Sequence, residues 1–408
     1  MLEGEIIRFY RERAKMTQAQ LGEGICTTTH VSKIERGKTA YSPDIINLFS
    51  RRLNIDVQKE IDTLRDLDHH LDQWHTAIIM EQIPLVKKIK NELEQITFIQ
   101  SSKYAVHYHL LTARYHILLK EHNIAFNILH KIQELDQDLS PYEKNLYLHV
   151  QGIYYIENKI YYSHEKPIEF LKEIDLNIYR NKEYYYHLSI AYHLIDSKVM
   201  AYSYGEKALD FFKESNNYSR AIDAESLMLL QLSSDPFCNF NELIERYQSL
   251  IQATDSLRLK NKKGLLLNNL GYEYFYRKEY KLAKSCYKEA LLLVDKANPM
   301  YLLRLYNYID TSLEGNLSKK SLLLKQINEG LTLATQYNQL HYSTLFKLLK
   351  LKAEGTTDKY YGFIEKQAFP QFSSRKHILF MKRFGKQLYD YYVETNQHIK
   401  AIEISNMI

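Results

Sequence analysis

The stretch TQAQLGEGICTTTHVSKIERG, residues 17–37, decides the fold of the N-terminal part of the chain. Thr17 and Gln20 have the spacing of a capping box, in which the Thr17 hydroxyl accepts from the backbone N–H of Gln20 and the Gln20 side chain accepts from Thr17 N–H. A helix is therefore expected to begin at this point. It should be short, because Gly22 and Gly24 weaken its continuation.

A second helix is predicted directly after this one. Thr27 offers a new N-cap, and a helix from about residue 28 to residue 36 should end at Gly37, since glycine is the usual residue where the backbone needs a positive φ. The sequence Ser42-Pro43-Asp44 then opens a further helix. Two helices joined by so tight a turn can place the second one in the major groove of double-stranded DNA. We therefore expect a DNA-binding helix-turn-helix module.

The pattern Thr17-Gln18-x-x-Leu21 followed by residues 31–37 resembles the helix-turn-helix of phage repressors and their bacterial relatives. The resemblance implies that Gln18 contacts a phosphate and that an Arg of the first helix, Arg11, pairs with Glu35 as a structural pair. It also implies that the exposed start of the second helix faces base edges. The expected DNA-binding residues are Gln18, Thr27, Thr28, Thr29, Lys33, Arg36 and Lys38. The alternative is a module of this fold that contacts a protein and not DNA.

Charge supports DNA binding only locally. The chain has 54 Lys and Arg against 49 Asp and Glu, so it is not a polycation that would bind nucleic acid by charge alone. One copy of the module would make few phosphate contacts. We therefore expect a homodimer that binds two half-sites.

The rest of the chain has the periodicity of a helical repeat array. The clearest unit spans residues 264–297, where small, aliphatic and aromatic residues have the spacing of a tetratricopeptide repeat of about 34 residues. Its positions are Leu267, Leu270, Gly271, Tyr274, Ala283, Tyr287 and Ala290. Weaker copies include Ala113, Ala125 and Leu129; Gly152 and Tyr155; Leu188, Tyr192, Ala201, Gly205 and Ala208; and Leu388, Tyr392, Ala401 and Ser405.

Stacked repeats of this kind form a superhelix with a concave face that suits an extended ligand. Asn residues on that face can both donate to and accept from a peptide main chain. By repeat position, the expected peptide-binding residues are Arg114, His149, Tyr186, His193, Asn268, Tyr272, Arg304 and Asn307. Most of the 35 Tyr residues are expected to pack between helices.

These patterns predict an all-α protein with a helix-turn-helix domain at residues 1–66 and a repeat array at residues 67–408. Residues 56–75 should form a helical connector, in which the adjacent His69 and His70 point to different faces and predict no metal site. The three Cys residues fit no metal or disulfide pattern, and no apolar run is long enough for a membrane span. We expect a cytoplasmic protein with no cofactor and no catalytic residue, since no P-loop or nucleophile motif is present.

A repressor-type helix-turn-helix joined to a tetratricopeptide array resembles the peptide-sensing quorum regulators of Gram-positive bacteria, the RRNPP family. The residues 21–26 and 31–35 resemble the short turn of its PlcR-type members. The resemblance implies a transcription regulator that is controlled by a short signalling peptide in the concave face. The alternative is a regulator whose array docks a protein partner such as a response regulator.

Overall fold

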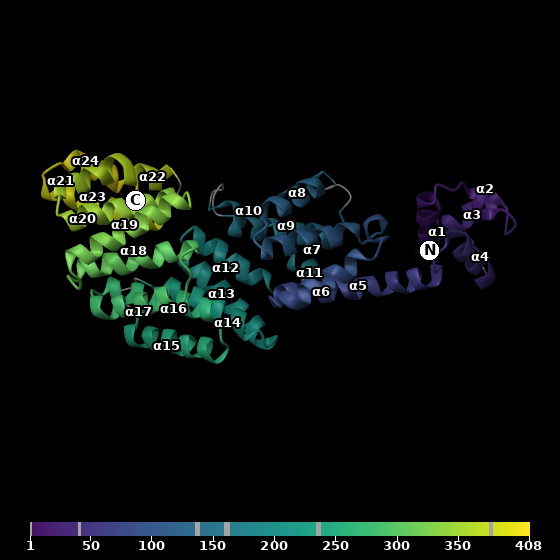
Figure 1. Cartoon of the computed structure of the whole chain (residues 1–408), viewed down its shortest axis with the longest axis horizontal. Helices are drawn as coiled ribbons and strands as arrows, with labels where there is room; N and C mark the ends of the chain where they lie inside the picture. Colours follow the sequence, from purple (N-terminus) through teal and green to yellow (C-terminus); the bar gives the residue numbers. More distant parts are fainter. Residues whose placement is uncertain (1, 40–41, 135–138, 159–163, 234–237, 375–377) are drawn as a thin grey trace. The chain divides into compact units, whose positions relative to one another are not determined.

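The computed structural model describes residues 2–39, 42–134, 139–158, 164–233, 238–374 and 378–408, and within these ranges it contains helices and no strand. The expected all-α class is confirmed. The contacts between helices divide the chain into two compact units, residues 1–191 and 192–408. The predicted boundary between residues 66 and 67 lies within α5 (Figure 1), and it stays a prediction.

The first unit begins with four short helices and continues with the helices that carry the start of the array. They are α1 (Leu2–Arg13), α2 (Gln18–Gly22), α3 (Thr28–Glu35), α4 (Pro43–Leu53), α5 (Val57–Ile79), α6 (Ile83–Glu94), η1 (Ile99–Ser101), α7 (Ala105–Leu118), α8 (His122–Gln133), α9 (Pro141–Glu157), α10 (Lys166–Leu171), α11 (Leu176–Tyr179) and α12 (Tyr184–Leu194), the last of which crosses the boundary.

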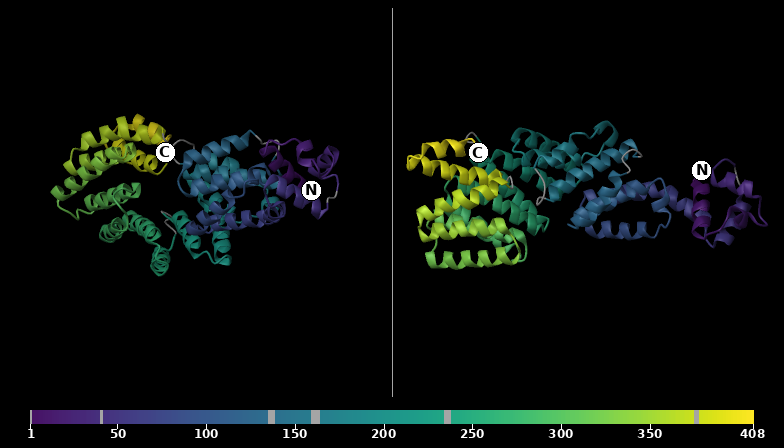
Figure 2. Two further views of the ribbon diagram at one scale, coloured as in Figure 1. Left: turned by 45° about the vertical axis from the view of Figure 1, so that its right-hand side comes forward. Right: turned by 90° about the horizontal axis from the view of Figure 1, so that it is seen from above.

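The second unit is a series of helix pairs that lie side by side (Figure 2). They are α13 (Lys198–Glu214), α14 (Tyr218–Leu232), α15 (Phe240–Ser256), α16 (Lys260–Tyr276), α17 (Tyr280–Leu292), α18 (Pro299–Glu314), α19 (Lys320–Gln336), α20 (Leu340–Glu354), α21 (Thr357–Phe363), a π-helical turn η3 (Ile364–Ala368), α22 (Phe369–Ser374), α23 (Ile378–Glu394) and α24 (His398–Ser405).

The ends of the N-terminal helices follow from the predicted caps. Thr17 and Gln20 form a full capping box on α2, Thr27 caps α3, and Ser42 caps α4 with Pro43 in its first turn. Gly37 has a φ of 64° where the chain leaves α3. Because each cap satisfies backbone N–H groups that the first helical turn cannot, the local sequence alone positions these helix ends.

The predicted repeat at residues 264–297 is the pair α16 and α17. A Cβ atom at Gly271 would lie 2.8 Å from the Tyr287 ring, so the glycine lets the two helices approach each other. Ala283 and Ala290 are fully buried in the same interface. Close packing of small residues against a large ring therefore sets the crossing of this pair.

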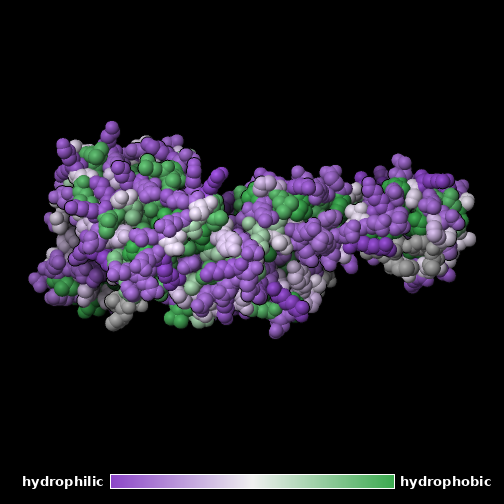
Figure 3. Space-filling view, turned by 90° about the horizontal axis from the view of Figure 1, so that it is seen from below, coloured by the Kyte–Doolittle hydropathy of each residue, from purple (hydrophilic) through white to green (hydrophobic). Residues whose placement is uncertain are grey.

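The surface is mostly hydrophilic. Figure 3 shows hydrophobic residues in small separate areas on the face that it draws. Among the described residues, no helix has the length and apolar character needed to cross a membrane.

Candidate functional site

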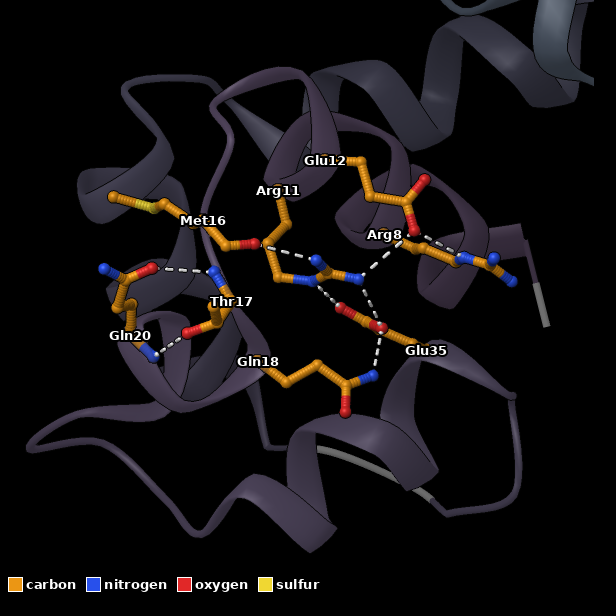
Figure 4. Close-up of polar contacts among 8 residues, drawn as sticks. All are labelled: Arg8, Arg11, Glu12, Met16, Thr17, Gln18, Gln20 and Glu35. Carbon is orange, nitrogen blue, oxygen red and sulfur yellow. Dashed lines mark hydrogen bonds and ion pairs between the residues drawn. The ribbon is translucent and has the colours of Figure 1, made fainter.

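A buried ion pair joins the first and third helices of the N-terminal module (Figure 4). Arg11 Nε donates to Glu35 Oε1 at 2.5 Å and Arg11 Nη2 donates to Glu35 Oε2 at 3.1 Å. A third proton donor comes from α2, because Gln18 Nε2 lies 2.7 Å from Glu35 Oε2. The hydrogen bonds to Glu35 raise the pKa of Arg11. The structure thus brings together the two residues expected to pair, and it adds Gln18 to them.

Gln18 was expected to contact a DNA phosphate. In the structure one of its two amide protons is donated to Glu35, and the side chain is half-buried. The contact with a phosphate stays a prediction. The hydrogen bond to Glu35 holds the start of α2 against the end of α3, which fixes the angle at which α3 is presented.

The outer face of α3 carries the residues expected to reach base edges. Thr28, Thr29 and Lys33 are exposed, whereas Val31 and Ile34 on the opposite side of the helix are fully buried. This alternation leaves one side of α3 unpacked at helical spacing. The remaining members of the expected set, Thr27, Arg36 and Lys38, are also exposed.

Arg52 is a structural residue that the sequence analysis did not identify. Its Nη1 atom donates to the backbone carbonyls of Leu21, at 2.9 Å, and of Glu23. These carbonyls belong to the end of α2, where no helical N–H is available to them. Its guanidinium therefore stabilises the turn between α2 and α3. A basic residue at the end of α4 gave no sequence signal of this long-range contact.

Two residues expected to line the peptide groove are instead buried inside the first unit. Arg114 Nη2 donates to Glu183 at 2.6 Å, and the His149 ring nitrogens contact the Tyr179 hydroxyl at 2.7 Å and His187 Nδ1 at 2.9 Å. Arg114 is 7% exposed and His149 is 1% exposed. Helices distant in sequence cover both side chains, and their contact with a peptide stays a prediction.

This buried cluster has the donor types of a metal site. One ligand atom from each of His149, Glu183 and His187 lies within 4.8 Å of the others. The Arg114 guanidinium already neutralises Glu183, so a divalent cation would place two uncompensated charges in the interior. We therefore assign the cluster to structure. Burial lowers the pKa of His149 well below its usual value and lowers the pKa of His75 to about 3, which leaves both rings neutral at pH 7.

The second unit holds the rest of the expected groove. Asn307 Nδ2 donates to Asn268 Oδ1 at 3.0 Å, so the two amides lie side by side on α18 and α16. Tyr272, one turn after Asn268, is half-buried, and His193 is exposed. Tyr186 is half-buried and belongs to the first unit.

Arg304 was also expected in the groove, and its contact with a peptide stays a prediction. The side chain is buried, its Nη1 donates to the Ala290 carbonyl at 2.7 Å, and it packs against Gly264. A Cβ atom at Gly264 would lie 2.6 Å from Arg304 Nη1. Arg304 therefore joins α18 to the end of α17.

Polar contacts connect the first helices of successive pairs in the second unit. Lys262 on α16 contacts Asp223 on α14, and Asp310 on α18 contacts Lys352 on α20 and Arg383 on α23. Burial alone would raise the pKa of Asp310, but Arg383 and Lys352 lower it to about 2. These contacts link the helices that carry Asn268 and Asn307 to their neighbours on both sides.

Comparison with known proteins supports both parts of this description. A helix-turn-helix family model matches residues 7–59. The transcriptional activator NprA of Geobacillus stearothermophilus is 22% identical over 410 residues, which is 95% of this chain and 97% of NprA. The similarity therefore extends over the whole array as well as the N-terminal module.

Two solved structures have the same fold. The apo form of the quorum sensor NprR from B. thuringiensis is 19% identical, with a TM-score of 0.68 over 84% of this chain and 97% of that one. NprR in complex with its cognate peptide NprX is 21% identical, with a TM-score of 0.65 over 82% of this chain and 98% of that one. The architecture expected from the sequence, a helix-turn-helix followed by a repeat superhelix, is confirmed.

Proposed function

We propose that this chain is a transcription regulator controlled by a short signalling peptide, of the kind that joins a repressor-type helix-turn-helix to a tetratricopeptide array. The exposed face of α3 is the observation that carries the DNA-binding half of the proposal. The full-length similarity to NprA and the shared fold with peptide-bound NprR support the other half. We place this activity in the cytoplasm, where the DNA is. The protein acts there as a regulator and not as an enzyme.

The peptide occupies the face formed by the first helices of the pairs in the second unit. Asn268 and Asn307 offer amide groups that can both donate to and accept from an extended main chain. Tyr272 and His193 add polar groups on either side. This set is smaller than the set expected from the sequence, since it omits the buried Arg114, His149 and Arg304, and also Tyr186 of the first unit.

The regulator works as a homodimer on two half-sites. Each module presents few base-reaching side chains, so affinity depends on the simultaneous placement of two modules. Peptide binding shifts the protein between conformations that differ in the spacing of the modules. A hundredfold preference of the peptide for one conformation supplies about 2.7 kcal/mol for this shift.

A binding experiment on the DNA upstream of the gene tests the DNA-binding half. We expect the purified protein to protect a site with two half-sites in a footprint, and the double variant Thr29→Ala with Lys33→Ala to lose this protection. The control is Lys88→Ala, whose side chain is 72% exposed on α6. Unchanged protection by the double variant, with the same mass in sedimentation, would refute the assignment of α3.

Calorimetry with synthetic heptapeptides tests the peptide half. We expect at least one peptide to bind and to change operator affinity. If no peptide does so, and a stoichiometric protein partner is recovered from cells and persists when peptides are added, the array is a protein-docking surface instead.

A further inference from the structure

A group of buried polar atoms without hydrogen-bond partners lies in the second unit beside the proposed groove. Glu273 on α16 is 0% exposed, and neither of its carboxylate oxygens accepts a well-formed hydrogen bond from a described residue, although Arg277 forms a long ion pair with Oε2. Asn269 Nδ2, one helical turn before Glu273, has no hydrogen-bond acceptor among the described residues either. Native interiors rarely leave such atoms unpaired, so each one needs an explanation.

Two neighbouring helices contribute further atoms of this kind. The Tyr247 hydroxyl on α15 and the Ser233 hydroxyl at the end of α14 have no partner in the described ranges. Tyr247 and Ser233 are both near enough to Glu273 to interact with it electrostatically. Burial raises the pKa of Glu273, against the opposing effects of Ser233, Arg277 and Lys198. Three helices therefore place polar groups around one buried carboxylate.

Arg277 covers this carboxylate without forming a hydrogen bond to it. Its Nη1 atom lies 3.7 Å from Glu273 Oε2, beyond hydrogen-bond distance, and Nη1 has no acceptor among the described residues. The guanidinium instead lies over the Phe240 ring, 3.9 Å from its centroid. The Arg277 side chain is 24% exposed. It is thus the group that would move aside if another cation reached Glu273.

The position of Glu273 connects it to the groove. Glu273 directly follows Tyr272 on α16 and is five residues from Asn268, whose amide contacts Asn307. Leu265 and Tyr276 on the same helix are 39% and 55% exposed. Around the helix axis, they lie between Asn268 and Glu273. A ligand that lies along α16 and contacts Asn268 would therefore pass beside the Arg277 side chain.

We propose that Glu273 is an anionic subsite of the peptide groove, which takes the ammonium or guanidinium group of a basic signalling peptide after Arg277 swings aside. This inference rests on the proposed peptide-binding function. An ammonium or guanidinium group supplies the donors that the two carboxylate oxygens lack, and the Tyr247 and Ser233 hydroxyls can complete its coordination. A buried carboxylate without a well-formed hydrogen bond costs stability in the free protein, as is common for binding groups that are already in place before the ligand arrives.

The test uses the full-length protein and a random heptapeptide library, once with free amino termini and once N-acetylated. Peptides retained by the protein are sequenced by mass spectrometry. We expect peptides with Lys or Arg at one position to be enriched about tenfold, as for a charge-assisted hydrogen bond in a buried site. If the bound cation is instead the amino terminus of the peptide, the N-acetylated peptides should not be retained. No position of the retained free peptides should then be enriched in Lys or Arg.

The variant Glu273→Gln should lose this preference, and the control Glu279→Gln, at an exposed position before α17, should keep it. Glu273→Gln should also unfold at the same temperature as the unmodified chain or at a higher one, because the buried charge that it removes accepts no well-formed hydrogen bond, and its ion-pair partner Arg277 is partly exposed to water.

Four outcomes would overturn the proposal. Retained peptides without any cation preference, or an unchanged preference in Glu273→Gln, would show that Glu273 does not recognise the ligand. A lower unfolding temperature for Glu273→Gln, or its failure to fold, would show that water or Arg277 satisfies the carboxylate structurally. If the unmodified protein retains no peptide at all, both the proposed function and this subsite are refuted. The other outcomes leave peptide binding intact.

Discussion

At the scale of single residues, the Arg11–Glu35 pair is the clearest stabilising contact of the DNA-binding module. The two side chains are 10% and 3% exposed, so removing one partner leaves a buried charge. We expect Arg11→Met, which keeps most of the apolar stem, to destabilise the module by about 3 kcal/mol. Hydrogen exchange of peptides from residues 2–39 should show this loss as faster opening.

The neighbouring Arg8 provides the control for this experiment. Its ion pair with Glu12 is 62% and 53% exposed, and Arg8→Met should cost less than about 1 kcal/mol. Equal exchange rates in the two variants would show that the Arg11 network is not a structural requirement of the module.

The buried imidazoles of the first unit predict a loss of stability in acid. Burial lowers the pKa of His75 to about 3, whereas the unfolded chain has the ordinary value near 6.5. The unfolded state therefore binds a proton first as the pH falls below about 6.5, and stability declines from that pH down to about 3. At pH 5 this single group should cost about 2 kcal/mol.

Urea unfolding followed by tryptophan fluorescence measures this effect, because the chain has one Trp, Trp74, which is buried next to His75. The variant His75→Gln stays neutral at every pH and should lose less stability between pH 7 and pH 5. His130→Gln, at an exposed position on α8, should behave like the unmodified protein. An identical pH dependence in all three proteins would contradict the assignment to His75.

At the scale of helices, two glycines with opposite surroundings give a matched pair of predictions. A Cβ atom at Gly271 would approach the buried Tyr287 ring to 2.8 Å, whereas a Cβ atom at Gly362 on α21 would have nothing within 4 Å. Gly271→Ala should destabilise the second unit by about 1–3 kcal/mol from overpacking, reduced by its gain in helix propensity. Gly362→Ala should stabilise it by up to about 1 kcal/mol.

Thermal unfolding of the full chain compares the two variants. Stabilisation by Gly271→Ala would mean that Tyr287 moves freely and does not set the crossing of α16 and α17. Replacing Tyr287 with Leu in the Gly271→Ala background should restore part of the loss, because the shorter side chain makes room for the new methyl group.

The sequence predicts most helix ends and few long-range contacts, and the reason is the range of the interactions. The caps at Thr17, Thr27 and Ser42 act within three residues, so the local sequence contains all the information needed. The partners of Arg114 and Arg52 lie 69 and about 30 residues away. Repeat position indicates which helix carries a residue but not whether a later helix covers it, and this is why the burial of Arg114 could not be predicted.

At the scale of the whole molecule, linkage between peptide and DNA provides the strictest test of the proposed function. If the peptide changes operator affinity by a given factor, the operator must change peptide affinity by the same factor. We expect a factor of about 5–150 in either direction, the usual range of coupling between two sites. Calorimetric titration of the most retained heptapeptide, with and without the operator fragment, measures it.

The double variant Thr29→Ala with Lys33→Ala separates coupling from simple peptide binding. It keeps the groove residues Asn268 and Asn307, so it should bind the peptide with the affinity of the unmodified protein in the absence of DNA. Addition of the operator fragment should then leave that affinity unchanged, because α3 can no longer engage the DNA. If the operator alters peptide affinity equally in both proteins, the DNA reaches the array through another surface, and the two-module mechanism is incorrect.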